Sequence, residues 1–95
     1  MHTINRFLEL TFDPVKNASN KAKHGVSLRE AAWIEWDTLL AKPDCRSAYG
    51  ETRMIGYAYI GPRLFCVVYT ERARECRIIS LRRANSREVK RYAEA

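Results

Sequence analysis

The most continuous hydrophobic pattern lies in the second half of the chain. Residues 64–70 are almost wholly apolar, and residues 76–81 are apolar apart from Arg77 and Ser80. β-Branched and aromatic residues, which suit a pleated surface, dominate both runs. The segment between them, residues 71–75, is too charged to be buried. We therefore predict a central β-hairpin that is covered over most of both faces and carries arginines at its ends.

Weaker patterns predict further strands before this hairpin. Residues 7–12 carry four apolar side chains with two polar ones between them, which favours a strand. Residues 38–41 are typical of a short strand and residues 51–60 of a longer one, separated by a segment of loop composition. Gly56, inside the longer strand, indicates a bulge or a close approach.

Capping residues predict the first helix. Asp13 can accept backbone N–H groups at a helix start, and Pro14 suits the first helical position. The helix is expected to run through His24 and to end at Gly25, because glycine readily adopts the left-handed conformation of a C-terminal cap.

Two more helices are predicted in the same way. Ser27 and Glu30 fit a capping box that opens a second helix, in which Trp33 and Trp36 are interpreted as core or partner contacts, with core favoured. Asn85 or Ser86 caps a last helix, with Glu88 three residues after Asn85. This order of elements predicts an α+β fold: an antiparallel β-sheet with two N-terminal helices and one C-terminal helix packed on it.

Composition narrows the setting. Ninety-five residues allow one domain, residues 1–95, with one core. The three cysteines are an odd number without a close pair, which argues against a disulfide framework and against a zinc site. No apolar run in residues 1–95 is long enough to span a membrane, and we expect no secretory signal. We expect a cytoplasmic protein with no metal and no cofactor.

Charge points to the partner. The net charge is +6, and ten of the twelve arginines lie at or after Arg46. Such a surface is explained by solubility alone about as well as by a polyanion partner, either nucleic acid or an acidic protein.

No common enzyme motif is present, but a set of arginine, glutamate and tyrosine residues could cut RNA. In metal-free cleavage the 2′-hydroxyl attacks the adjacent phosphate, so the protein must move two protons and stabilise added negative charge. Tyr69 or Tyr49 could stack on a base. Candidates for proton transfer are Glu71, His24 and Tyr92, and candidates for charge stabilisation are Arg63, Arg72, Arg77 and Arg82.

Each candidate also has a purely structural interpretation. His24, before the capping Gly25, is more often found at such a place for contacts with the helix end than for catalysis. Glu71 could pair with a neighbouring arginine in a solvated turn, and Arg77 could form a salt bridge within the fold. From these residues alone, catalysis is the less favoured interpretation.

Several segments together resemble one protein family. They are KHGVS (residues 23–27) followed by Glu30 and Ala31, Tyr49-Gly50-Glu51 with Arg53, VVYTER (67–72), RIISLRRA (77–84), and then Glu88 and Tyr92. In order and approximate spacing they are similar to the BrnT toxins, across nearly the whole chain. No single segment is diagnostic, but the combination is specific.

The resemblance implies a RelE-like ribonuclease fold and a type II toxin–antitoxin module. It implies an RNA substrate that is cut without metal, inhibition of translation, and a BrnA-like ribbon-helix-helix antitoxin that caps the toxin in a hetero-oligomer. Operator DNA would be bound through the antitoxin only.

Carried over by position, the resemblance places the family's charged strand residues and its histidine–glycine turn within one predicted site. Catalytic candidates are Arg63, Glu71, Arg72, Arg77, Arg82 and His24; RNA-binding candidates are Lys23, Arg46, Arg53, Tyr69, Arg83 and Tyr92. The sequence departs from the family pattern at Leu28, at residues 34–37 and at Leu81. The first two departures affect helix packing, whereas Leu81 lies near the proposed site.

Two hypotheses from different classes follow. One is a ribonuclease toxin. The other is a non-catalytic module of toxin fold that acts through antitoxin or nucleic-acid binding, for which salt-sensitive RNA binding without cleavage is expected.

Overall fold

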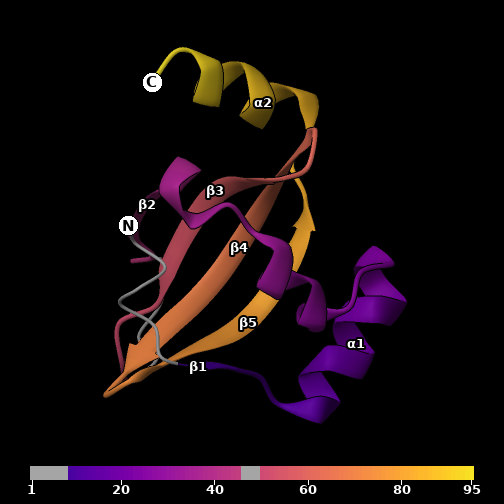
Figure 1. Cartoon of the computed structure of the whole chain (residues 1–95), viewed down its shortest axis with the longest axis vertical. Coiled ribbons are helices and arrows are strands. Elements are labelled where there is room, and N and C mark those ends of the chain that lie inside the picture. The colour runs from indigo at the N-terminus through magenta and orange to yellow at the C-terminus, as the bar shows by residue number, and fades with distance from the viewer. Residues whose placement is uncertain (1–8, 46–49) are drawn as a thin grey trace.

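The computed structural model describes residues 9–45 and 50–95. Within these residues five strands form one sheet in the order β1-β5-β4-β3-β2 (Figure 1). The strands are β1 (Glu9–Thr11), β2 (Leu40–Pro43), β3 (Met54–Ile60), β4 (Arg63–Arg72) and β5 (Glu75–Arg83). β1 runs parallel to β5, and every other neighbouring pair is antiparallel. The α+β prediction is confirmed, with a sheet that is mixed and mostly antiparallel.

The first predicted helix is α1 (Pro14–His24). The Asp13 side chain accepts a hydrogen bond from the Val15 N–H at 2.8 Å. Gly25 closes the helix with φ of +74°, and its N–H donates to the Lys21 carbonyl at 2.9 Å. The predicted bounds and both capping residues are therefore confirmed.

The last predicted helix is α2 (Ser86–Ala93). Asn85 is its cap and forms a full capping box, because the Glu88 side chain also accepts from the Asn85 backbone N–H. In Figure 1 this helix lies beside one end of the sheet.

The second predicted helix is wrong in type. The segment forms two 3-10 helices, η2 (Leu28–Trp33) and η3 (Trp36–Thr38), separated by an extended Ile34. Ser27 caps η2 as expected, accepting from the Arg29 N–H at 3.1 Å. The buried positions Leu28, Ala31 and Ile34 recur every three residues, which matches the three residues per turn of a 3-10 helix.

The two tryptophans separate. Trp36 is 2% exposed and packs edge-to-face on Tyr69, with 5.9 Å between ring centroids. Trp33 is 73% exposed, so the interpretation as core holds for Trp36 alone.

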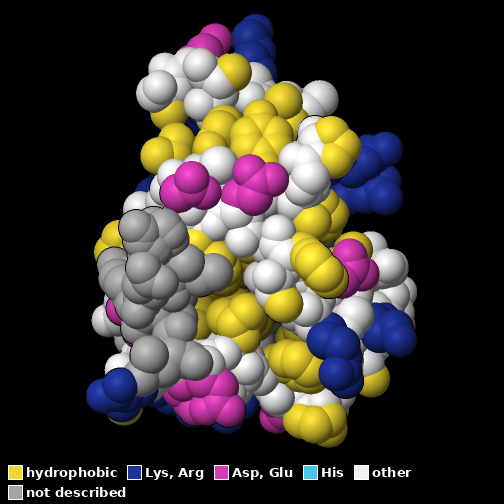
Figure 2. Space-filling model, viewed as in Figure 1, with side chains coloured by type: hydrophobic (Ala, Val, Ile, Leu, Met, Phe, Trp, Pro, Cys, Tyr) yellow, Lys and Arg dark blue, Asp and Glu magenta, His cyan; other side chains and the backbone are white. Residues whose placement is uncertain are grey.

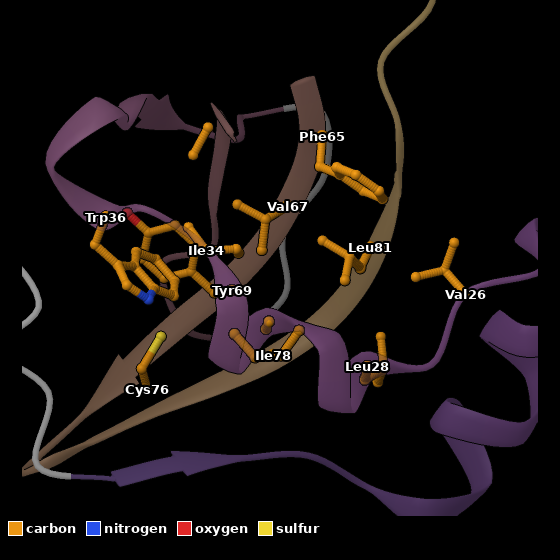
Figure 3. Close-up of a cluster of buried hydrophobic side chains, with 12 residues drawn as sticks. Val26, Leu28, Ile34, Trp36, Phe65, Val67, Tyr69, Cys76, Ile78 and Leu81 are labelled. Carbon is orange, nitrogen blue, oxygen red and sulfur yellow. The ribbon is translucent and has the colours of Figure 1, made fainter. Parts of the chain in front are cut away.

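The core lies between the sheet and η2 and η3 (Figure 3). The largest apolar side chains of the sheet that are fully buried there are Val67, Tyr69, Ile78 and Leu81. Asn20 of α1 is also buried, and its side-chain amide binds both the carbonyl and the N–H of Leu81. Its Nδ2 donates to the Leu81 carbonyl at 2.8 Å, and its Oδ1 accepts from the Leu81 N–H at 3.2 Å. A third bond, from Nδ2 to the Val26 carbonyl, fixes the loop after α1 as well.

Strand boundaries show smaller differences. β2 begins at Leu40 and β3 at Met54, two and three residues later than predicted, and residues 7 and 8 of the first predicted strand lie outside the described residues. Gly56 marks a close approach, because an added Cβ would lie 2.7 Å from Leu39 Cδ1. The register shift of the sheet lies elsewhere, at Val68/Tyr69. The RelE-like assignment and the single domain stay predictions.

Candidate active site on the open sheet face

The sheet presents a second set of side chains on the side away from η2 and η3. Side chains alternate along a strand, so cross-strand neighbours share a face. Ile55, Val68 and Ser80 form one row across β3, β4 and β5. Tyr57, Cys66 and Arg82 form the next row, and Arg77 continues the set on β5. We call this set the open face; apart from the buried Cys66, these side chains are half-buried.

One end of the open face holds Arg82, Glu88 and Tyr57 together. Arg82 donates from Nη1 and Nη2 to the two Glu88 carboxylate oxygens, each at 2.9 Å. The Tyr57 hydroxyl donates to Glu88 Oε2, also at 2.9 Å. α2 thus contributes one carboxylate that orients an arginine of β5 and a tyrosine of β3.

These contacts shift all three acid–base equilibria. The Arg82 guanidinium is the main reason that the pKa of Glu88 falls to about 2, with burial opposing it. Burial, and then the bond to Glu88, raise the pKa of Tyr57, and the same carboxylate raises the pKa of Arg82. Glu88 is therefore ionised at neutral pH and a poor proton acceptor, which suits a residue that positions its neighbours.

A second carboxylate–arginine pair lies toward the other end of the sheet. Arg72 donates to Glu51 from Nε at 3.0 Å and from Nη2 at 2.8 Å. This bond is the main reason that the pKa of Glu51 is lowered, and Arg53 and Arg77 contribute to the lowering by their charge. Three arginines therefore lie within electrostatic range of one exposed carboxylate.

Arg77 differs from Arg72 and Arg82 because no carboxylate binds it within the described part of the chain. It lies in the middle of β5, beside Thr70 of β4 and Thr11 of β1. Its side chain is half-buried, and its Nε is buried without a hydrogen-bond partner among the described residues. A buried guanidinium nitrogen without a partner is costly. Because the side chain as a whole is only half-buried, an anion would reach this guanidinium through its other N–H groups.

Lys23 and His24 approach the sheet from the α1 side. A cleft of about 160 Å³ joins them to Ile79 and Ser80 of β5. Ser80 lies between Arg77 and Arg82 in the sequence and belongs to the open face. Both predicted residues therefore flank this face at the edge of β5.

Other predicted residues lie elsewhere. Arg63 and Arg83 line a separate cleft of about 250 Å³ with Pro62 and Val89, at the end of β4 next to α2. Glu71 is exposed opposite Cys76, in register with the core-facing side chains. The structure thus does not bring Arg63, Arg83 or Glu71 together with Arg77.

The tyrosines predicted to contact RNA differ in their exposure. Tyr69 is 1% exposed, so its ring is part of the core and not available to a base. Tyr92 is half-buried; its hydroxyl donates to the Thr38 carbonyl, and its ring packs edge-to-face on Tyr59. Arg46, and Tyr49 as an alternative stacking residue, lie outside the described residues.

Sequence reasoning missed Tyr57 and Glu51, and it treated Glu88 chiefly as a helix cap. A signal for Tyr57 was present: small Gly56 and Ala58 alternate with Tyr57 and Tyr59 along β3. The small residues fit the crowded core side, which directs both tyrosines to the opposite side.

This arrangement can bind and polarise a phosphate. Arg77 and Arg82 lie on one strand and one face, and arginine binds phosphate oxygens through several N–H groups. Among residues 9–45 and 50–95, no three His, Cys, Asp or Glu side chains are grouped so as to hold a metal ion. No helix in that part of the chain is long and apolar enough to cross a membrane.

Comparison with known proteins gives one result. Residues 12–88 match the family described as "Ribonuclease toxin, BrnT, of type II toxin-antitoxin system". The match covers most of the chain, from Phe12 before α1 to Glu88 in α2. No curated protein matches the sequence.

Proposed function

The chain belongs to the BrnT family of ribonuclease toxins of type II toxin–antitoxin systems, and we propose that it cuts RNA on the open face without a metal ion. The observation that carries this proposal is Arg77, a half-buried cation whose Nε lacks a hydrogen-bond partner among the described residues. The scissile phosphate is the ligand that this cation fits. Arg82 lies on the same face, beyond the row that contains Ser80.

The proposed reaction needs only groups of the RNA and side chains of the protein. The ribose 2′-hydroxyl loses a proton and its oxygen attacks the adjacent phosphorus; the bond to the 5′-oxygen breaks, and that oxygen takes up a proton. The products are a 2′,3′-cyclic phosphate and a free 5′-hydroxyl. Arg77 and Arg82 stabilise the negative charge that accumulates on the phosphoryl oxygens, which is usually the largest contribution to such a reaction.

The two proton transfers are assigned to the remaining candidates. His24, at the edge of β5, flanks the open face, whereas the Tyr92 hydroxyl already donates to the Thr38 carbonyl and Glu71 lies further away. Glu88 is not proposed as a base, because its pKa of about 2 makes it a weak acceptor. Arg72, Arg53 and Lys23 are proposed to hold neighbouring phosphates.

The biological setting is proposed on the same basis. The toxin would act on RNA in the cytoplasm and slow translation, and a BrnA-like ribbon-helix-helix antitoxin would neutralise it in a hetero-oligomer. Operator DNA would be contacted through the antitoxin. An acidic antitoxin segment over Arg77 and Arg82 would block RNA by competition, and a complex that still cuts RNA at full rate would contradict this proposal.

The decisive experiment is cleavage of a defined, end-labelled RNA by the purified protein with EDTA present. We expect cleavage by the wild type, strong loss in Arg77→Ala, and little change in Arg29→Ala. The substitution Arg29→Ala removes the same positive charge, but from η2, which lies on the opposite side of the sheet. Salt-sensitive binding of RNA that stays intact, also with translating ribosomes present, would instead support the non-catalytic binding module.

A further inference from the structure

A groove runs between α2 and the sheet, next to the Arg82–Glu88 pair. Its volume is about 260 Å³. Leu40, Ala41 and Ile55 form its apolar part, and Leu40 is 47% exposed on the edge strand β2. Tyr57 and Tyr92 add two aromatic rings. Figure 2 shows the opposite side of the molecule, where η2 and η3 cover the sheet and apolar groups are exposed between acidic and basic side chains.

The two rings in the groove are held in place. The Tyr57 hydroxyl donates to Glu88, and the Tyr92 hydroxyl donates to the Thr38 carbonyl. Both hydroxyl groups are thus used within the fold. Because little rotamer freedom remains, binding a flat ligand against these rings would cost little side-chain entropy.

Cations surround the groove. Lys42 and Arg91 line it from β2 and α2, and Glu88, which also lines it, is bonded to Arg82 of the proposed phosphate site. An apolar groove with positive charges on two sides, next to the arginine of the proposed phosphate site, matches a nucleotide: a base for the apolar part and phosphates for the cations.

We propose that this groove binds one unpaired base of the RNA substrate and so helps to select the position of the cut. This inference rests on the proposed function, and it adds a base-binding subsite to the phosphate site. A base that lies between Leu40 and the Tyr57 and Tyr92 rings would place its own backbone phosphates between Lys42 and Arg82.

The test uses a short single-stranded RNA whose riboses are all 2′-O-methylated, so that the attacking group is blocked. A matched series replaces one nucleotide at a time with an abasic residue, and affinity is measured by fluorescence anisotropy. For the wild type we expect roughly five- to tenfold weaker binding when one particular base is missing. In Leu40→Gln and Leu40→Glu, removing the base at that position of the RNA should weaken binding no more than removing any other base.

Val15→Glu is the matched control. Val15 is 76% exposed in the first turn of α1. The substitution Val15→Glu therefore adds the same negative charge as Leu40→Glu, but at a site away from the groove. Thermal melts confirm that each variant is folded, and Leu40→Gln separates the apolar contact from the added charge.

The outcomes separate this inference from the proposed function. An abasic series without a distinct position, or a Leu40→Glu effect no larger than that of Val15→Glu, overturns the base-binding groove, while cleavage of unmodified RNA by the wild type would still support the nuclease. If the wild type neither binds nor cuts RNA, the proposed function fails and this inference fails with it.

Discussion

The two faces of this sheet are made by the same strands but use their side chains differently. On the covered face, Val67, Ile78 and Leu81 pack under η2 and η3, and the buried amide of Asn20 satisfies the Leu81 backbone. On the open face, the Glu88 carboxylate accepts hydrogen bonds from Arg82 and Tyr57. The Nε of Arg77 has no hydrogen-bond partner in the described structure. The covered face therefore carries most of the stability, whereas the open face is the one on which we propose that RNA binds.

The largest effect is expected from Arg77→Ala, which should separate activity from stability. Removal of the cation that we propose to bind the scissile phosphate should lower the cleavage rate roughly 10²- to 10³-fold, as for other charge-stabilising donors. Stability should stay equal or rise slightly, because a buried nitrogen without a partner is removed. Single-turnover cleavage and urea unfolding measure the two quantities. A variant that is fully active, or inactive only because it is unfolded, would contradict the division between the faces.

Asn20→Ala should show the opposite behaviour. The substitution removes three hydrogen bonds and leaves the Leu81 N–H and two carbonyl groups without a partner, so we expect a loss of about 2 to 4 kcal/mol in the free energy of unfolding. The cleavage rate per folded molecule should change little. Asn17→Ala is the matched control: Asn17 is half-buried and accepts two hydrogen bonds, from Ser27 and Leu28, so its loss should be smaller.

The difference between the faces also explains what the sequence could reveal. Patterns that depend on local geometry were sufficient: Asp13 and Gly25 fixed the bounds of α1, and Asn85 with Glu88 fixed the start of α2. The second predicted helix, which opens at Ser27 and includes Trp33 and Trp36, differs in type, because its cap is common to both helix types and only the burial of every third residue distinguishes them.

The sequence predicts less well which candidate residues lie together, because that depends on the face of the sheet that each arginine occupies. The hairpin sequence contains Arg63, Arg72, Arg77 and Arg82, and nothing local shows that Arg63 lies in a separate cleft. The register shift at Val68/Tyr69 adds to the difficulty, since it changes which residues of β5 share a face. Contacts between distant segments, such as Glu51 with Arg72, cannot be read from periodicity.

A smaller effect is expected from Glu88→Gln, which tests how the open face is ordered. Its carboxylate accepts from Arg82 and Tyr57, and its side chain is 12% exposed. Loss of the charge should cost about 1 to 2 kcal/mol of stability. Because Arg82 would lose its orientation, RNA cleavage should fall as well.

The same carboxylate predicts a pH dependence. Its pKa is about 2 in the folded protein against an ordinary 4.5, so its contribution to stability is complete above pH 4.5 and is lost as the pH falls toward 2. The difference in unfolding free energy between wild type and Glu88→Gln should therefore shrink over this range. A difference that stays constant from pH 7 to pH 2.5 would show that the charge of Glu88 is not the cause.

The smallest effect is expected from Glu51→Gln, although the pair with Arg72 has nearly the same bond lengths. The two side chains are 33% and 46% exposed, so water and salt screen their attraction, and exposed pairs of this kind contribute little to stability. Melting temperatures should differ from the wild type by less than those of Glu88→Gln, and the difference should vanish in high salt. RNA affinity should rise instead, because Arg53, Arg72 and Arg77 lose the carboxylate that competes with phosphate. If Glu51→Gln destabilises the protein as much as Glu88→Gln does, then exposure is not what distinguishes the two pairs, and both would have to be treated as structural.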